Sequence, residues 1–212
     1  MSESIPSLLS AENLECTRDD RLLFNGLSFA LGSGEVLQIE GPNGSGKTSL
    51  LRILSGLRRA DDGEVRWQGD DIRRAREDYY ASMVYIGHLP CIKNDLTTLE
   101  NIRVLLDTRS QSVSSAKVEQ ALASVGLAGF EDVAGKALSS GQRRRVLFAF
   151  LLLAEAKLWI LDEPLTALDV KGVEMVESMI LEHRENGGSV VFTTHHGMQL
   201  PCDMKRVDLA LC

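Results

Sequence analysis

A glycine-rich segment, GPNGSGKT, occupies positions 41–48, directly after a short apolar run and directly before a periodic, helix-like segment. Its glycines allow a tight backbone curl, in which successive amides point at phosphate oxygens near the positive end of the helix. Lys47 adds a point charge, and Thr48 offers a hydroxyl ligand for Mg²⁺. The segment therefore predicts a binding loop for the phosphates of ATP. The residues expected to form it are Gly41, Pro42, Asn43, Gly44, Ser45, Gly46, Lys47, Thr48 and Ser49.

Two adjacent carboxylates follow a second apolar run, Leu158–Leu161, and precede Pro164. We expect Asp162 to orient Mg²⁺ and its water shell, and Glu163, which points elsewhere, to polarise the water that attacks the γ-phosphate. Taken alone, an Asp-Glu pair is as compatible with a strand-to-helix turn that carries an N-cap as it is with a catalytic role. Beside a phosphate-binding loop, the pair indicates phosphoryl transfer to water.

A third segment, LSSGQ at 138–142, begins a further helix-like stretch. The residues concerned are Ser139, Ser140, Gly141 and Gln142. Their amides and the Ser139 hydroxyl can face another phosphate, although Ser139 and Gln142 also form a capping-box pattern that needs no ligand. Because one loop already encloses one side of a triphosphate, we expect this terminus to serve a nucleotide held by a second copy. The basic run that follows, Arg143–Arg145, is typical of a solvated helix face.

Alternating strand and helix patterns predict an α/β fold with a parallel-sheet core. The N-terminal stretch Leu8–Phe29 alternates polar and apolar residues, which indicates antiparallel strands. The expected core elements are a strand at Glu35–Glu40, a helix at Ser49–Leu57, a strand at Leu158–Asp162, a helix at Val170–Arg184, and strands at Ser189–Thr194 and Val207–Leu211. Helical patterns between these elements predict an inserted helical subdomain at about 92–156, so that residues 1–212 form one domain.

Composition excludes several classes of protein. A chain of 212 residues with a net charge of −7 is not expected to bind nucleic acid. Its four cysteines are far apart and match neither a disulfide framework nor a zinc site. The N-terminus has no secretory pattern, and Glu155 and Lys157 interrupt the most apolar stretch before it reaches the length of a membrane span. We therefore expect a protein of the cytosol that borrows any membrane contact from a partner.

The motifs together resemble those of the ATP-binding cassette (ABC) ATPases, over about Leu14 to Leu211. They come in the order of that family: GPNGSGKT, LSSGQ, LWILDEP, Ala167-Leu168-Asp169 and Thr194-His195. The resemblance implies a P-loop NTPase cassette with a RecA-like core, and two copies packed head to tail around MgATP. It implies that His195 holds Glu163 and the γ-phosphate in register. It further implies that Asp169 makes a contact across the dimer.

Three positions depart from the common cassette. His88 stands where the family usually has a glutamine that reaches Mg²⁺, and a neutral imidazole still offers one acceptor nitrogen. Arg18 stands where an aromatic residue usually stacks on adenine, and a guanidinium plane can also stack on a base. Ser140 replaces the first signature glycine. We expect His88 to be a metal ligand and Arg18 an ATP contact.

These departures resemble one branch of the family, the ATP-binding subunits of cytochrome c maturation haem exporters. Its marks here are the hairpin Arg18–Arg21, the pair Gly87-His88 and the run Thr193–His196. The branch implies an integral membrane transporter subunit and haem-handling maturation proteins as partners, at the cytoplasmic face of the inner membrane. The alternatives are an exporter of lipid, lipoprotein or a small molecule, and a non-transport ABC switch. The single phosphate loop and the absence of a long coiled-coil pattern argue against the switch.

Overall fold

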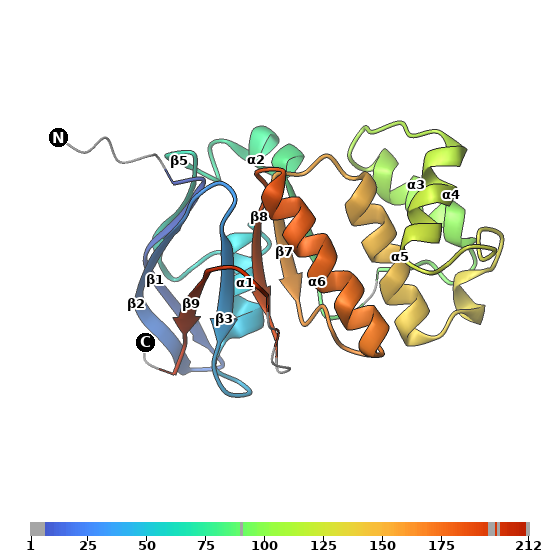
Figure 1. The fold of residues 1–212 in the computed structure, drawn as a ribbon. Coiled ribbons are helices and arrows are strands. Elements are labelled where there is room, and N and C mark those ends of the chain that lie inside the picture. The colour runs from blue at the N-terminus through green and yellow to red at the C-terminus, as the bar shows by residue number, and fades with distance from the viewer. Residues whose placement is uncertain (1–6, 90, 195–197, 199, 211–212) are drawn as a thin grey trace.

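The computed structural model describes residues 7–89, 91–194, 198 and 200–210, which fold around two sheets (Figure 1). An antiparallel sheet has the strand order β2-β1-β4-β5, and a parallel sheet has the order β6-β7-β8-β3-β9. The strands are β1 Leu9–Arg18, β2 Arg21–Leu31, β3 Val36–Glu40, β4 Asp62–Trp67, β5 Asp70–Asp71, β6 Met83–Ile86, β7 Leu158–Asp162, β8 Ser189–Thr193 and β9 Met204–Asp208. The helices are α1 Lys47–Leu54, α2 Arg76–Ser82, α3 Thr98–Asp107, α4 Ser115–Ser124, the 3₁₀ turn η1 Gly135–Ala137, α5 Ser140–Leu153 and α6 Val170–Glu185.

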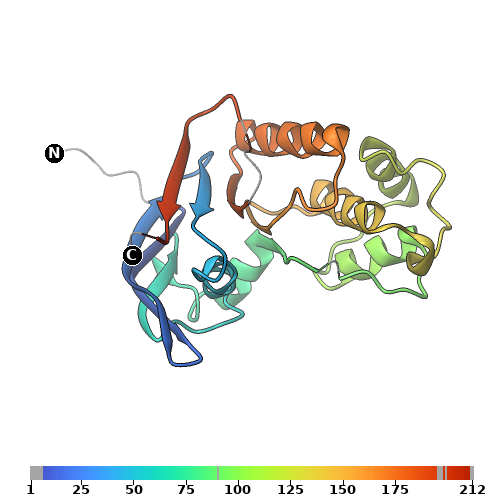
Figure 2. The same ribbon diagram turned by 90° about the horizontal axis from the view of Figure 1, so that it is seen from below.

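Each face of the parallel sheet carries its own hydrophobic core. Trp159 and Leu161 of β7 pack with α3, α4, α5 and α6, whereas Leu158 and Ile160 pack with α1 and the antiparallel sheet. Side chains alternate between the faces of a strand, so a strand covered on both sides is apolar on both, as β7 is from Leu158 to Leu161. Figures 1 and 2 show the antiparallel sheet at one end of the molecule and α3, α4 and α5 at the other.

The predicted α/β class, with an antiparallel N-terminal sheet and a parallel core, is confirmed. The strand expected at Val207–Leu211 is misplaced, since β9 covers Met204–Asp208 and pairs with β3 from Val36↔Met204 to Glu40↔Asp208. This edge strand exposes Lys205 and Arg206, which form ion pairs with Glu35 and Glu40. These two charged residues interrupt the apolar pattern by which the sequence would indicate a strand. Edge strands carry such charges more often than central ones.

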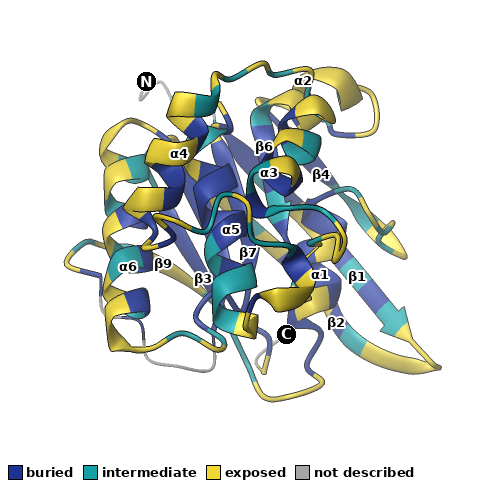
Figure 3. Cartoon of the chain, turned by 90° about the vertical axis from the view of Figure 1, so that its right-hand side faces the viewer, coloured by how far each residue is buried: buried dark blue, intermediate teal, exposed yellow. Residues whose placement is uncertain are grey.

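Helices α3, α4 and α5 occupy the interval between β6 and β7, where the sequence predicts helices. Figure 3 shows exposed residues on α3 and α4, whereas α5, on which both of these helices pack, is largely buried. The domain bounds of about 92–156 stay a prediction. Among the described residues, no helix combines the length and the apolar character that a bilayer crossing needs.

His183, near the end of α6, should make folding stability depend on pH. Its ring stacks on Trp159, with centroids 3.8 Å apart and planes within 6°. Burial lowers the pKa of His183 from 6.5 to about 4, so between these values the unfolded chain binds more protons than the folded one. The contribution of His183 to stability is therefore fully present above pH 6.5 and falls as the pH drops toward about 4. Because the ring is only partly buried, this loss is below the value of about 1.4 kcal/mol per pH unit for a fully shielded group.

His183→Phe keeps a flat ring against Trp159 but removes the titrating group. Between about pH 7.5 and about pH 5 we expect the wild type to lose about 1 kcal/mol more stability than this variant, as measured by urea unfolding. The aspartates and glutamates titrate equally in both proteins, so their effect on stability cancels when the two proteins are compared. Equal losses in the two proteins would contradict the assignment.

Candidate active site

The loop at 41–46 joins the end of β3 to the start of α1, as its sequence predicts. Gly41, Gly44 and Gly46 have φ values of +139°, +80° and +105°, which L side chains rarely adopt. A Cβ atom at Gly41 would lie 2.7 Å from Ser45 Oγ, and one at Gly46 would lie 3.1 Å from Leu23 Cβ. Glycine is therefore required for the curl. In the described chain α1 begins without a side-chain cap, which leaves its first amides to a ligand.

Lys47 lies inside this loop and is 8% exposed. Its Nζ donates to Gly41 O at 2.7 Å and to Pro42 O at 3.1 Å. An ammonium group carries three N–H bonds, so one remains for a phosphate oxygen. Ser45 Oγ is buried nearby and has no hydrogen-bond partner among the described residues. The loop thus offers a cation and an uncommitted hydroxyl to an anionic ligand.

Asp162 and Glu163 lie at the end of β7, beside β8. Asp162 is 1% exposed, and its Oδ1 accepts a hydrogen bond from Thr193 Oγ1 at 2.9 Å. Thr193 Oγ1 in turn accepts from the Glu163 N–H at 3.0 Å. Asp162 Oδ2 is buried and has no hydrogen-bond partner in the described chain. A buried carboxylate oxygen of this kind is costly unless it binds a cation, and this one fits Mg²⁺.

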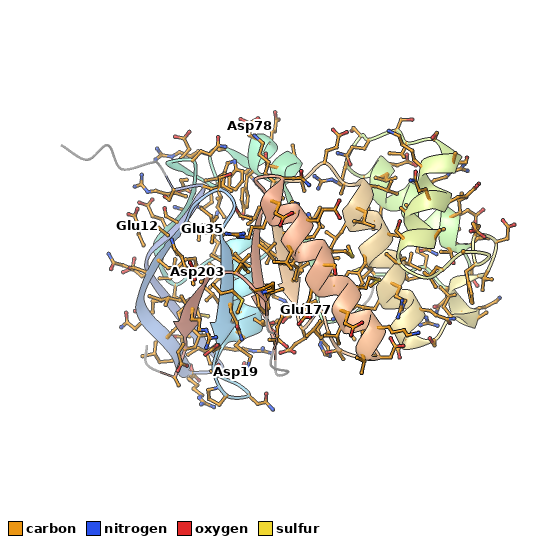
Figure 4. The ribbon with its side chains drawn as sticks, viewed as in Figure 1. Glu12, Asp19, Glu35, Asp78, Glu177 and Asp203 are labelled. Carbon is orange, nitrogen blue, oxygen red and sulfur yellow. The ribbon has the colours of Figure 1, made fainter. Side chains whose placement is uncertain are left out.

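One cleft of about 540 Å³ brings these segments together. Its lining residues are Arg18, Asp19, Arg21, Leu23, Asn43, Gly44, Gly46, Lys47, Thr48, Ser49, His88, Asp162, Glu163 and Thr166. The hairpin between β1 and β2 therefore reaches the phosphate loop, and Figure 4 shows Asp19 at the end of the molecule where β3 ends. Sequence reasoning missed four of the lining residues as site residues: Asp19, Arg21, Leu23 and Thr166. His195 lies outside the described residues, so its expected role stays a prediction.

The signature residues are absent from the lining of this cleft. Ser139 Oγ accepts from Gln142 N at 3.2 Å and Gln142 Oε1 accepts from Ser139 N at 2.8 Å, which completes the capping box. That alternative is therefore realised, and a role toward a second copy's nucleotide remains a prediction. Ser140 begins α5 just after this cap. A Cβ at Gly141 would lie 2.7 Å from Ala167 O, so the helix start packs on the loop before α6.

Asp169 has two partners in its own chain. Its Oδ1 accepts from Gly172 N at 3.0 Å, which caps α6, and from Arg145 Nη2 at 2.8 Å. The cap and the Arg145 guanidinium together lower the pKa of Asp169. The described residues contain no group of three or more His, Cys, Asp or Glu side chains placed to hold a metal. Mg²⁺ commonly binds through one or two protein groups and substrate phosphates, so the donors in the cleft suffice.

The expectation that Arg143–Arg145 forms a solvated face is wrong. Arg144 is 2% exposed, and the other two side chains are half-buried. Arg143 Nε donates to Gly135 O at 3.0 Å, and Arg145 Nη1 donates to Val125 O at 2.8 Å. Each guanidinium meets carbonyls at the ends of other segments, which the spacing along α5 alone does not reveal.

Comparison with known proteins agrees with this geometry. The family model described as "ABC transporter" matches residues 24–166. Cytochrome c biogenesis ATP-binding export protein CcmA of Methylococcus capsulatus is 50% identical over 95% of this chain and 98% of its own. The CcmA proteins of Vibrio cholerae and Hahella chejuensis are 49% and 46% identical, over 90% and 95% of this chain and 92% and 95% of their own.

Solved structures share the fold. A putative ABC transporter ATP-binding protein from Pyrococcus furiosus superposes with a TM-score of 0.84 at 24% identity, covering 96% of this chain and 98% of its own. A nucleotide-free ATP-binding cassette from an ABC transporter superposes with a TM-score of 0.75 at 22% identity, covering 90% of this chain and 82% of its own. At such identities the likeness concerns the fold alone.

Proposed function

Because the chain belongs to the ABC transporter family and, within it, to the CcmA group of cytochrome c biogenesis ATP-binding export proteins, we propose that it is the ATP-hydrolysing subunit that powers haem export in cytochrome c maturation. The observation that carries this proposal is the single cleft shared by the phosphate loop, Asp162 and Glu163. A cation, unused donors and two carboxylates meet there, as hydrolysis of a triphosphate requires.

The residues of the cleft divide the work. Lys47 and the loop amides bind the β- and γ-phosphates, and Arg18 stacks on the base. Thr48 and Asp162, with an imidazole nitrogen of His88, would hold Mg²⁺. When bound, Mg²⁺ supplies positive charge that offsets the charge on the phosphate oxygens. Glu163 accepts the proton of the attacking water.

The proposal includes a second copy of this chain. Ser139, Ser140, Gly141 and Gln142 of one copy would face the nucleotide bound to Lys47 of the other. Supporting this, these residues line no part of their own cleft, and α5 presents amides at its start. Asp169, on the loop against which Gly141 packs, would then reach across the dimer. Its pairing with Arg145 ties that contact to α5.

We also propose the remaining partners and the location. An integral membrane transporter subunit like CcmB would receive the motion of the dimer, and haem-handling maturation proteins would receive the product. The assembly would lie at the cytoplasmic face of the inner membrane. The net charge of −7 argues against a nucleic-acid partner.

A reconstituted complex tests this function. The chain is co-expressed with its membrane subunit, and ATP hydrolysis is measured with and without Mg²⁺, and with haem or phospholipid added. We expect Mg²⁺-dependent hydrolysis that responds to haem. A response to lipid alone would favour the alternative exporter. A complex that neither retains nucleotide nor hydrolyses it would overturn the proposal.

A further inference from the structure

Arg144 is a buried cation to which none of the roles above is assigned. Its guanidinium donates four hydrogen bonds within the described structure, all to backbone carbonyls. Nη1 donates to Gly87 O at 2.9 Å and to His88 O at 3.3 Å. Nη2 donates to Asp162 O at 3.1 Å and to Glu163 O. One side chain thus joins α5, the loop after β6 and the end of β7.

This burial has an electrostatic cost. Removal from water lowers the pKa of Arg144, and the carboxylates of Asp162 and Glu163 act in the opposite direction. An apolar side chain of similar size would pack in this interior without a desolvation penalty. A guanidinium instead contributes a planar set of five N–H donors, which suits carbonyls that approach from two sides. Arg144 therefore serves this position through its directed hydrogen bonds rather than by filling space.

The two segments that Arg144 joins both lead into the cleft. Strands β6 and β7 are parallel neighbours, with Ile86 opposite Leu161, so their following loops leave the same edge of the sheet. His88 and Glu163 line the cleft, whereas Arg144 does not. The guanidinium therefore lies behind the site and contacts the backbone that carries the site's side chains.

The backbone at Glu163 is the one that most needs such support. Its φ of 51° falls in the left-handed region, which residues other than glycine adopt infrequently. Thr193 Oγ1 accepts a hydrogen bond from the Glu163 N–H, and Arg144 donates to the Glu163 carbonyl. The peptide groups on both sides of Glu163 are therefore held by side chains from other elements. These bonds fix the position of the backbone from which the Glu163 side chain extends.

We propose that Arg144 is a positioning residue for ATP hydrolysis. It holds Glu163 in its left-handed conformation and sets the spacing between Glu163 and the His88 loop. Because Arg144 is on the helix that begins at the Ser139 cap, it also connects the terminus that would face the second copy's nucleotide with the base of its own cleft. This inference rests on the proposed function and deepens it.

The test compares Arg144→Met and Arg144→Lys in the complete transporter complex, with steady-state ATP hydrolysis in Mg²⁺. We expect kcat to fall by about 10- to 100-fold in Arg144→Met with KM within about twofold, because the side chain aligns the base without lining the cleft. Arg144→Lys should recover part of kcat, since one ammonium reaches only one of the two loops. Arg143→Met is the matched control, because Arg143 Nε donates to Gly135 O, outside the cleft, and its kcat should stay within about twofold.

A folded Arg144→Met complex with wild-type kcat, or with a raised KM and unchanged kcat, would overturn the inference. If that variant does not fold, Arg144→Lys is measured alone and in the Glu163→Gln background. Positioning through Glu163 predicts that the lysine change costs nothing further there, whereas a merely structural role predicts the same fold loss in both backgrounds. If the wild-type complex itself fails to hydrolyse ATP, the proposed function fails first.

Discussion

Replacing Glu163 by Gln should lower turnover by about 100- to 10,000-fold while leaving nucleotide binding intact. The change removes a proton acceptor but keeps the shape of the side chain, and removal of a general base typically lowers rates by about 100- to 10,000-fold. The Glu163 N–H and C=O keep their bonds to Thr193 and Arg144 in the variant, so the local backbone should persist. With ATP and Mg²⁺ the variant should accumulate as a dimer, because the sandwich closes and is not released by hydrolysis.

Size-exclusion chromatography with ATP and a phosphate-release assay measure the two effects separately. Glu155→Gln is the matched control, because Glu155 is exposed on the loop after α5 and the change alters the net charge equally. That protein should hydrolyse ATP at the wild-type rate. Brisk phosphate release by Glu163→Gln would show that another group acts as the base.

Local patterns were enough to predict the curl of the glycine-rich loop at 41–46 and the position of Asp162 and Glu163 at the end of a strand. A glycine pattern between a strand and a helix specifies the curl at 41–46 through backbone freedom alone, and its positive φ values confirm the reason. Residues Leu158–Leu161 are apolar on both faces of the strand, and the predicted bounds Leu158–Asp162 match those of β7. Both signals depend only on residues a few positions apart along the chain, so they can be recognised in a single sequence.

Contacts between distant segments were not predictable in the same way. The carbonyl partners of Arg144 lie 18 to 57 residues away along the chain, so its burial depends on how β6, β7 and α5 assemble. A run of three arginines on a helix looks the same in sequence whether it meets solvent or carbonyls. The difference between the predicted and observed bounds of β9 has a related cause. Lys205 and Arg206 are charged and exposed because β9 is an edge strand, and the sequence alone does not show which strand lies at the edge.

Lys47→Met should weaken the binding of ATP, the step that precedes the proposed hydrolysis at Glu163. The methionine keeps most of the aliphatic stem in the buried loop, whereas the ammonium and its bond to a phosphate oxygen are lost. A hydrogen bond to a charged group is worth about 1.5–3 kcal/mol, so we expect the Kd for ATP to rise by about 10- to 150-fold. Gly41 O and Pro42 O also lose their donor, which should lower folding stability modestly.

Titrations with ATP and with adenosine show whether the lost affinity concerns the phosphates or the base. Affinity for adenosine, which has no phosphate, should be unchanged in Lys47→Met, because the proposed function places the base against the β1–β2 hairpin rather than against the loop. Lys157→Ala, at an exposed lysine, controls for the loss of one positive charge and should bind both ligands as the wild type does. Equal weakening for ATP and adenosine would mean that the loop had collapsed. An unchanged Kd for ATP would remove Lys47 from the phosphate site, and with it the reason to expect hydrolysis in this cleft.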